Sequence, residues 1–260
     1  MTVEGLWIKY GTEAPWYVTY CVYSYLALLS ATFVANLPFL IIEVFFKNHP
    51  YIVSRQINPK KSMPTEKYWK IFKGFMRGLL THSVGSSVFA GLLFRWRGCS
   101  IGPLPSILEV VVSIFCFMLI EDTLFYWIHR LLHWSEFLYK HVHIHHHEEL
   151  QNTVSVGHQY FHAIELSLGA GLPFIAGPLL LKSHMVTFFI WTFVMMIESS
   201  IAHCGYDFPF LNFIQDARVH AYHHSHYMDN YGSYFNLWDK LLGTNKNFKQ
   251  YEQRRLAKQK

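Results

Sequence analysis

The segment that most constrains the fold of this chain is Tyr17–Ile42, a stretch of 26 residues without a charged side chain. A helix needs about 20 apolar residues to cross the hydrocarbon core of a bilayer, so this segment is long enough to span a membrane. The chain of 260 residues is 52% hydrophobic and only 15% charged, which is too apolar for an ordinary soluble domain of this size. The sequence therefore predicts a membrane protein.

Other apolar segments predict further membrane helices. They are Leu79–Phe94, Ser106–Ile128, Ala163–Leu181 and Met185–Ala202. Between the first two spans, residues 43–78 read as a polar interfacial loop with an amphipathic piece near Tyr68–Phe75. Charged groups inside a span are costly unless paired, so we expect Glu121 and Asp122 to lie near the membrane interface or a metal. The expected fold is an all-α membrane protein with four to five transmembrane or re-entrant helices.

The basic residues predict the orientation of these helices. If the chain crosses five times, one side receives 18 of the 22 Lys and Arg residues, in segments 43–78, 129–162 and 203–260, and the other receives 4. The positive-inside rule then places those three segments in the cytosol. The net charge of +5 could indicate nucleic acid, but this distribution favours a membrane surface. Four crossings with one re-entrant segment would fit equally well.

Three groups of histidines have helical spacing, and all of them fall in the predicted cytosolic segments. The groups are His129 with His133, His143 with His146 and His147, and His220 with His223 and His224. Residues three and four positions apart project from the same face of a helix. Together the groups offer eight nitrogen ligands, and one metal ion takes about four to six. The spacing therefore favours two metal ions over a solvated histidine-rich loop.

The pattern also limits the chemistry. The sequence HRLLH (129–133) has the histidine spacing of zinc proteases, but Arg130 occupies the place of their general base, which argues against a hydrolase. Imidazole suits iron, copper or zinc, and zinc has no redox chemistry, so the metal decides between oxygen chemistry and a structural role. Asp122 precedes His129 by seven residues on the same helical face, where it could accept a hydrogen bond from a ligand N–H or only cap the interface.

The motifs H-x-x-x-H (129–133), H-x-x-H-H (143–147) and H-x-x-H-H (220–224) resemble the three histidine boxes of the fatty acid hydroxylase and sterol desaturase superfamily of membrane di-iron enzymes. Within that superfamily, IEDTLFYWIHRLLH, AHCGYDFP and NYGSYFNLWDKLLGT resemble sterol C-4 methyl oxidases, and HHSHY (223–227) is similar to cholesterol 25-hydroxylase. The resemblance covers about residues 121–244.

The resemblance implies a helical membrane fold with a cytosolic helical cap that carries a dimetal site. It implies membrane helices and a basic cytosolic loop at 1–120, a catalytic domain at 121–250 and a basic tail at 251–260. It further implies two iron ions, dioxygen as co-substrate, and electrons from NAD(P)H through cytochrome b5 or its reductase at the endoplasmic reticulum membrane.

The resemblance also extends the list of candidate residues. His203 stands where the family has a further ligand, which gives nine candidates for metal binding. His162, Asp122, Glu165 and Asp207 are expected around the ligands rather than among them.

The expected function is oxidation of the C-4 methyl group of a methylsterol by a di-iron monooxygenase. The segment between Tyr206 and His220 is short for a C-4 methyl oxidase, so side-chain hydroxylation at position 25 and sterol desaturation stay open as alternatives. A membrane scaffold stabilised by zinc is the non-enzymatic alternative.

Overall fold

The computed structural model describes residues 2–58, 64–149 and 153–257, and within these ranges the chain is helical with a single isolated β-bridge between Gln56 and Tyr206. The elements in chain order are α1 (Val3–Trp7), η1 (Ile8–Thr12), η2 (Val18–Val22), α2 (Tyr23–Ile41), η3 (Ile42–Phe46), α3 (Pro50–Arg55), α4 (Thr65–Leu80), α5 (His82–Arg97), α6 (Ile107–Trp134), α7 (Glu136–His141), η4 (His143–Glu149), η5 (Ser155–Gln159), η6 (Glu165–Gly171), α8 (Leu172–Leu180), α9 (Met185–Ala202), η7 (Pro209–Leu211), α10 (Ala217–His226), α11 (Leu237–Leu242) and α12 (Lys246–Ala257). The expected all-helical architecture is confirmed for the described residues.

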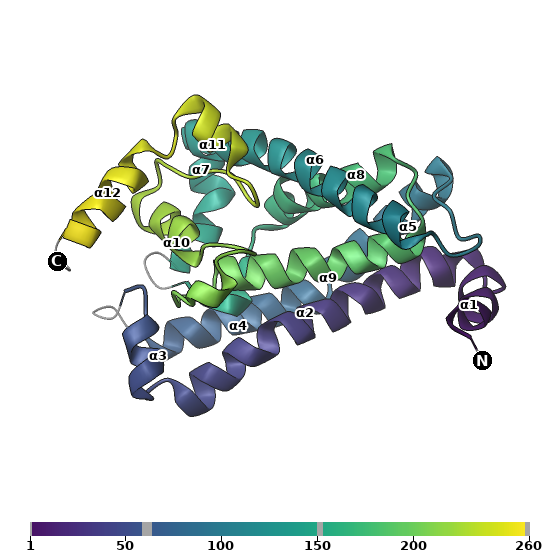
Figure 1. Ribbon diagram of the computed structural model, residues 1–260, viewed down its shortest axis with the longest axis horizontal. Coiled ribbons are helices and arrows are strands. Elements are labelled where there is room, and N and C mark those ends of the chain that lie inside the picture. Colours follow the sequence, from purple (N-terminus) through teal and green to yellow (C-terminus); the bar gives the residue numbers. More distant parts are fainter. Residues whose placement is uncertain (1, 59–63, 150–152, 258–260) are drawn as a thin grey trace.

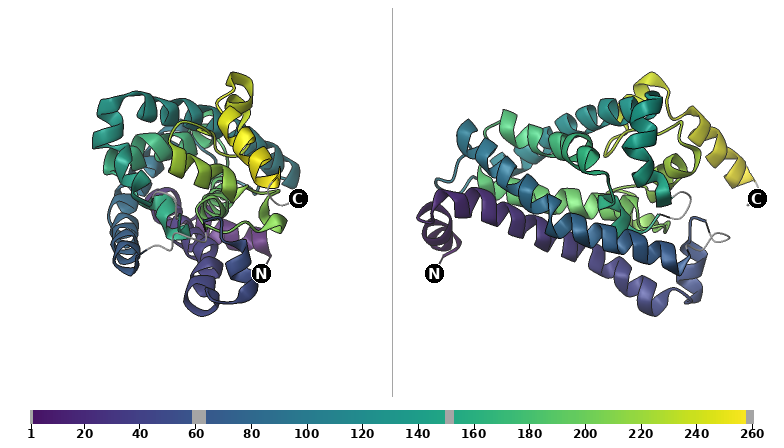
Figure 2. Two further views of the ribbon diagram at one scale, coloured as in Figure 1. Left: turned by 90° about the vertical axis from the view of Figure 1, so that its left-hand side faces the viewer. Right: turned by 180° about the vertical axis from the view of Figure 1, so that it is seen from behind.

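The long helices lie side by side along the longest axis of the molecule (Figures 1 and 2). Helix α2 packs against α9, α6 packs against α8, and α5 contacts both α2 and α8. The N-terminus lies at one end of this bundle, and α3, α10 and α12 gather toward the other end, where the C-terminus also lies (Figure 1). The N-terminal segment therefore lies at one end of the bundle, and the C-terminal helices lie at the other.

Hydrogen bonds show which connecting segments meet at each end. At the N-terminal end, the Trp7 indole donates to the carbonyl oxygen of Gly102 at 2.9 Å, and the backbone N–H of Ser100 donates to Ser183 at 3.2 Å. At the other end, the backbone N–H of Asp207 donates to the carbonyl oxygen of Arg55 at 2.8 Å. Segments 1–16, 95–105 and 182–184 therefore meet at one end of the bundle, as expected for connecting segments that alternate between two sides.

Two helical stretches, Val18–Phe46 and Met185–Ala202, are long and apolar enough to cross a membrane, and Glu165–Leu180 is a shorter apolar helix. Large apolar side chains such as Phe33, Phe89 and Phe115 are exposed on the outside of the bundle. Exposed apolar area on this scale suits contact with lipid.

The segment before the second predicted span differs from the expectation. Instead of a loop with a short amphipathic piece near Tyr68–Phe75, the chain forms the 16-residue helix α4. Its residues Ile71, Phe75 and Leu79 are buried, while its charged side chains cover the opposite face. The helix ends where Thr81 leaves the helical conformation (φ −121°, ψ −70°), so α5 begins three residues later than the predicted span.

Helix α6 is longer than its apolar part. It begins at a capping box in which Ser106 and Glu109 satisfy each other's backbone N–H groups, which explains the acidic residue at the start of an apolar helix. Its 28 residues span about 42 Å, and a bilayer core is about 30 Å thick. The helix thus carries His129 and His133 beyond the apolar part of the bundle in one continuous rod.

The packing of α5 against η2 gives a first prediction. A Cβ atom on Gly91 would lie 2.6 Å from the carbonyl oxygen of Tyr20, whereas one on Gly85 of the same helix would meet nothing within 4 Å. We expect Gly91→Ala to lower the free energy of unfolding by about 1–3 kcal/mol, the cost of overpacking a close helix contact.

Thermal unfolding of the purified protein in detergent measures this effect, with Gly85→Ala as the matched control. The control should leave stability unchanged or raise it slightly, because alanine favours a helix over glycine by about 1 kcal/mol. Equal stability of the two variants would contradict the close approach at Gly91.

Candidate metal centre

Four parts of the chain deliver the nine candidate histidines to one place. The C-terminal half of α6 carries His129 and His133, the 3₁₀ helix η4 carries the second group, α10 carries the third, and His203 is the C-cap of α9. Asp216 caps the start of α10 by accepting the backbone N–H of Arg218 at 3.0 Å. The structure therefore brings together residues that lie up to 95 positions apart in the sequence.

The nine side chains form two groups, in each of which the potential ligand atoms lie within 4.8 Å of one another. Cluster A consists of His129, His133, His143, His147 and His223. Cluster B consists of His146, His203, His220 and His224. The clusters adjoin, because the ring centroids of His147 and His224 are only 4.7 Å apart.

Each H-x-x-H-H group is divided between the two clusters. In both groups the residues at i and i+4 share a cluster, and the residue at i+3 belongs to the other. His143 and His147 thus lie in cluster A while His146 lies in cluster B, and His220 and His224 lie in cluster B while His223 lies in cluster A. Each motif therefore links the two clusters.

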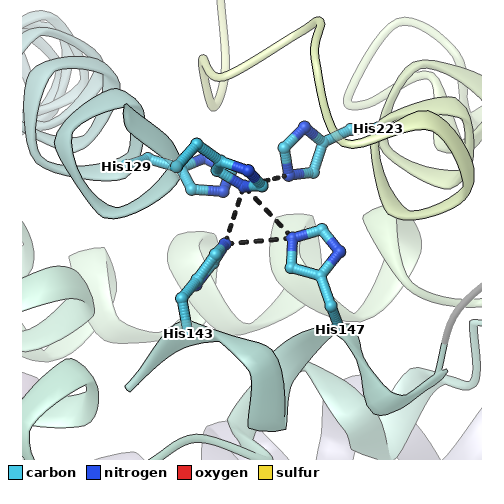
Figure 3. Close-up of side chains that lie close together, drawn as sticks. His129, His143, His147 and His223 are labelled. Carbon is cyan, nitrogen blue, oxygen red and sulfur yellow. Dashed lines mark hydrogen bonds between the residues drawn. The ribbon is translucent and has the colours of Figure 1, made fainter. Parts of the chain in front are cut away.

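In cluster A the imidazole rings are turned toward one another, as Figure 3 shows for His129, His143, His147 and His223. The Nε2 atom of His133 is 2.8 Å from that of His143, 3.1 Å from that of His223 and 3.2 Å from that of His147. In cluster B the Nε2 atom of His220 is 2.9 Å from that of His203 and 3.0 Å from that of His224.

The opposite ring nitrogens show which tautomer several histidines adopt. Three Nδ1–H groups donate to backbone carbonyl oxygens: His129 to Tyr231 at 2.9 Å, His203 to Ser199 at 3.0 Å and His223 to Asp229 at 2.7 Å. The Nδ1–H of His143 donates to the Glu165 carboxylate at 2.5 Å. A neutral imidazole carries one proton, so the Nε2 atoms of these four rings are lone-pair acceptors.

Lone pairs that converge at such distances repel one another unless a cation lies between them. One proton on His133 could satisfy only one of its neighbours, and the buried Nε2 atom of His129 has no hydrogen-bond partner within the described ranges. Two nitrogens that are each about 2.1 Å from a shared cation lie about 3.0 Å apart at a right angle and about 3.4 Å apart at a tetrahedral angle. The observed spacings therefore fit metal ligands in both clusters.

Burial keeps these side chains in the form that binds metal. Burial is the main cause that lowers the pKa of His143, His147, His220, His223 and His224 well below the usual value for histidine. Neighbouring imidazoles lower these pKa values further, because a second positive charge nearby is unfavourable. The rings are therefore neutral at physiological pH, with their lone pairs available.

Of the residues expected around the ligands, Glu165 contacts one directly. It accepts the Nδ1–H of His143 and begins the π-helical segment η6, whose wider turn is a feature found often at functional sites. The other three lie elsewhere. His162 stacks on His145 with ring centroids 5.7 Å apart, and Asp207 lies 3.8 Å from the guanidinium of Arg218.

The proposed role of Asp122 as an acceptor for a ligand N–H is wrong. Its two oxygens accept the backbone N–H groups of Phe235 and Leu237 at 3.1 and 3.4 Å, and His129 donates to Tyr231 instead. The backbone N–H groups of Phe235 and Leu237 need hydrogen-bond acceptors on the buried side of α6, and Asp122 supplies them in place of an acceptor for His129. Asp122 therefore anchors the segment that supplies the carbonyl oxygen for His129.

Two supporting residues carry no spacing signal in the sequence. Asp239 is fully buried and accepts the backbone N–H groups of Tyr231 and Gly232 at 3.0 and 2.7 Å, which fixes the loop behind His129. His158 is buried beside cluster B, with its ring centroid 6.3 Å from that of His203, and donates from Nδ1 to the carbonyl oxygen of Ser155 at 2.6 Å. Asp239 acts within its own loop, whereas His158 reaches cluster B through a contact between distant segments.

A mostly apolar cavity of about 640 Å³ extends from cluster B into the helical bundle. His146, His203 and His220 form part of its wall, and Phe174, Ile175 and Phe188 from the apolar helices α8 and α9 line its apolar part. A volume in the range of about 300–1,000 Å³ is typical of sites for small organic ligands. A molecule at this end of the cavity would contact cluster B.

Comparisons with known proteins agree with this site. Residues 114–244 match the model of the fatty acid hydroxylase family, which includes all nine histidines. The chain is 34% identical to methylsterol monooxygenase 2-2 from Arabidopsis thaliana, over 95% of this chain and 93% of the relative, and 31% identical to the C-4 methylsterol oxidase erg25 from Schizosaccharomyces pombe, over 98% and 87%. The chain belongs to the fatty acid hydroxylase family.

A third relative has a different activity in its name. The chain is 31% identical to the very-long-chain aldehyde decarbonylase GL1-10 from Oryza sativa subsp. japonica, over 96% of this chain and 84% of the relative. No solved structure matches the chain. The family is therefore shown by sequence, and the relatives include more than one activity.

The bond between Glu165 and His143 gives a second prediction. Replacing an acceptor that orients a metal-binding histidine costs about 10–100-fold in metal affinity. We expect Glu165→Gln to lose metal at lower chelator concentrations than the unmodified protein, by a factor in that range, while remaining folded.

Metal content after equilibration with graded chelator measures this loss. Glu136→Gln is the control, because that carboxylate is exposed and pairs with the exposed Lys140 on α7. If Glu165→Gln and the control retained metal equally, Glu165 would not support a ligand.

Proposed function

We propose that this protein is a membrane-bound oxidoreductase that holds two iron ions in clusters A and B and uses dioxygen to oxidise the C-4 methyl group of a methylsterol. The observation that carries the proposal is the pair of buried histidine clusters at the wall of an apolar cavity. The relatives named methylsterol monooxygenases, which include proteins from plants, yeast and vertebrates, support the substrate class.

The number of ligands favours iron over zinc. Zinc sites in proteins are almost always four-coordinate, and cluster A offers five imidazoles. Five or six ligands with nitrogen donors suit an octahedral metal with redox chemistry, such as iron. When bound, a pair of irons would supply the activation of dioxygen that oxidation of an unactivated methyl group requires.

The residues of the chain itself hold and shield the substrate. The nine histidines come from rigid elements, and the cavity keeps a substrate against His146, His203 and His220 of cluster B. The apolar wall excludes water, which favours a lipid and protects a reactive centre from side reactions. Cluster B, with four candidate ligands to the five of cluster A, leaves more room for a substrate or dioxygen.

The charge distribution supports a cytosolic position for the clusters, and the electron donor is proposed from the family resemblance. In the sequence, segments 43–78, 129–162 and 203–260 hold 18 of the 22 basic residues, and the last two segments carry all nine candidate histidines, which favours the cytosolic face of the endoplasmic reticulum membrane. Electrons would come from NAD(P)H through cytochrome b5 or its reductase. A donor on the cytosolic side would reach the clusters without crossing the membrane.

The rice relative gives a specific reason to test a second substrate class. Its name records activity on very-long-chain aldehydes, and an extended hydrocarbon chain would also suit an apolar cavity. Hydroxylation of a sterol side chain and sterol desaturation are the further alternatives, because both would use the same metal centre. A zinc-stabilised scaffold is the alternative without activity.

Metal analysis and reconstitution test the proposal together. We expect two irons per chain, and with NADH, cytochrome b5 and its reductase we expect oxidation of a 4,4-dimethylsterol in preference to cholesterol and a long-chain aldehyde offered in parallel. Products are identified by mass. Zinc without iron, or oxidation of cholesterol or the aldehyde alone, would contradict the proposed activity.

A matched pair of histidine variants shows whether turnover depends on the clusters. His146→Ala removes a ligand of cluster B and should abolish sterol oxidation without preventing membrane insertion. His226→Ala is the control, because its ring stacks on Tyr222 at 3.9 Å and belongs to neither cluster. Activity retained by His146→Ala would remove that residue from the ligands.

A further inference from the structure

Two buried glutamates stand out in the wall of the apolar cavity. Glu121 on α6 is 2% exposed and Glu198 on α9 is 3% exposed, and they supply the only carboxyl groups among the described residues that line the cavity. A buried carboxyl group is costly unless it is paired or hydrogen-bonded. Neither group has a role among the metal ligands, so their presence here needs a separate explanation.

Glu198 is held in place by its neighbours. Its Oε1 atom accepts the side-chain amide of Gln215 at 2.7 Å, and its Oε2 atom accepts the hydroxyl of Ser199 at 3.2 Å. The same amide group of Gln215 also donates to the carbonyl oxygen of Ser233 at 3.3 Å. The carboxylate therefore has a fixed position with lone pairs left over, since each oxygen accepts two hydrogen bonds.

The Glu121 carboxyl group has an acceptor position that no neighbour among the described residues fills. Its buried Oε2 atom has no hydrogen-bond partner in the part of the chain that the structure describes. An unpaired buried acceptor costs about 1–3 kcal/mol, and a donor supplied by a bound molecule would recover that cost. The feature points to a ligand with a hydroxyl or another hydrogen-bond donor.

The position of the pair along the bundle sets where that donor must lie. Glu198 precedes His203 by five residues, or about 7.5 Å along the helix axis, and Glu121 precedes His129 by eight residues, or about 12 Å. The carboxyl groups therefore lie near the metal-facing end of the cavity. A ligand whose donor they bind would present a neighbouring carbon to cluster B.

We infer that Glu121 and Glu198 form a hydroxyl-binding site that fixes which end of the lipid substrate faces the metal centre. The inference rests on the proposed function and narrows it. A sterol with a 3-hydroxyl beside its C-4 methyl group fits this arrangement, because its single O–H donates to Oε2 of Glu121 or to a free lone pair of Glu198 while the neighbouring methyl group faces cluster B. A sterol oxidised at the far end of its side chain places its hydroxyl too far away, and a long-chain aldehyde has no hydroxyl to donate.

Equilibrium binding without a reductant tests the inference apart from turnover. A radiolabelled 4,4-dimethylsterol is displaced from the iron-loaded protein by the same sterol with a free 3-hydroxyl or with a 3-methyl ether. We expect the unmodified protein to bind the free hydroxyl about tenfold or more tightly, as a hydrogen bond to a carboxylate predicts. Equal affinity for the two competitors would overturn the inference without any variant.

Substitutions of the two glutamates then show whether these residues cause the preference for the free hydroxyl over the methyl ether. Glu198→Gln and Glu121→Gln should each reduce it severalfold by weakening binding of the hydroxyl sterol, while affinity for the methyl ether and the iron content stay unchanged. Glu136→Gln, on the exposed face of α7, should keep the full preference. Loss of iron in the glutamate variants, or equal weakening toward both sterols, would show a structural role and overturn the inference.

The outcomes separate this inference from the proposed function. If the unmodified protein binds neither sterol and oxidises none, the proposed function fails. If it oxidises the C-4 methyl group but its hydroxyl preference survives both substitutions, only the hydroxyl-binding site fails.

Discussion

The structure depends on the convergence of imidazole lone pairs in its interior. Several ring nitrogens of clusters A and B approach within 3.2 Å of one another, and hydrogen bonds at Nδ1 leave at least four of them without a proton. Such an arrangement fits metal ions held between the nitrogens. A metal ion bound in either cluster would be coupled to the packing of α6, α9, α10 and η4, because the free energy of ligation would stabilise the contacts among these elements.

The segment 229–239 supports both the metal centre and the substrate cavity. Its carbonyl oxygens at Asp229 and Tyr231 accept from His223 and His129, and Gly232 and Ser233 line the cavity. Asp122 and Asp239 hold this segment through its backbone N–H groups. A short loop anchored at two carboxylates thus sets the orientation of two ligands and part of the wall that a substrate touches.

Much of this organisation could be predicted from the sequence, because helical spacing and hydropathy are local properties. The helical fold, the two helices long and apolar enough to cross a membrane, the convergence of the three histidine groups and the inclusion of His203 in a cluster followed from such patterns and from the family resemblance. The division of each motif between two clusters could not be predicted, since it depends on how η4 and α10 face each other. Asp122, Asp239 and His158 take their roles from contacts across more than a hundred residues or from loops without a spacing signal.

The most direct test of this account is X-ray absorption spectroscopy of the purified, metal-loaded protein. The account predicts two iron ions per chain, each with four or five imidazole nitrogens at about 2.1 Å and no sulfur ligands. A single metal site per chain, or a first shell made mainly of water and carboxylate oxygen, would contradict it.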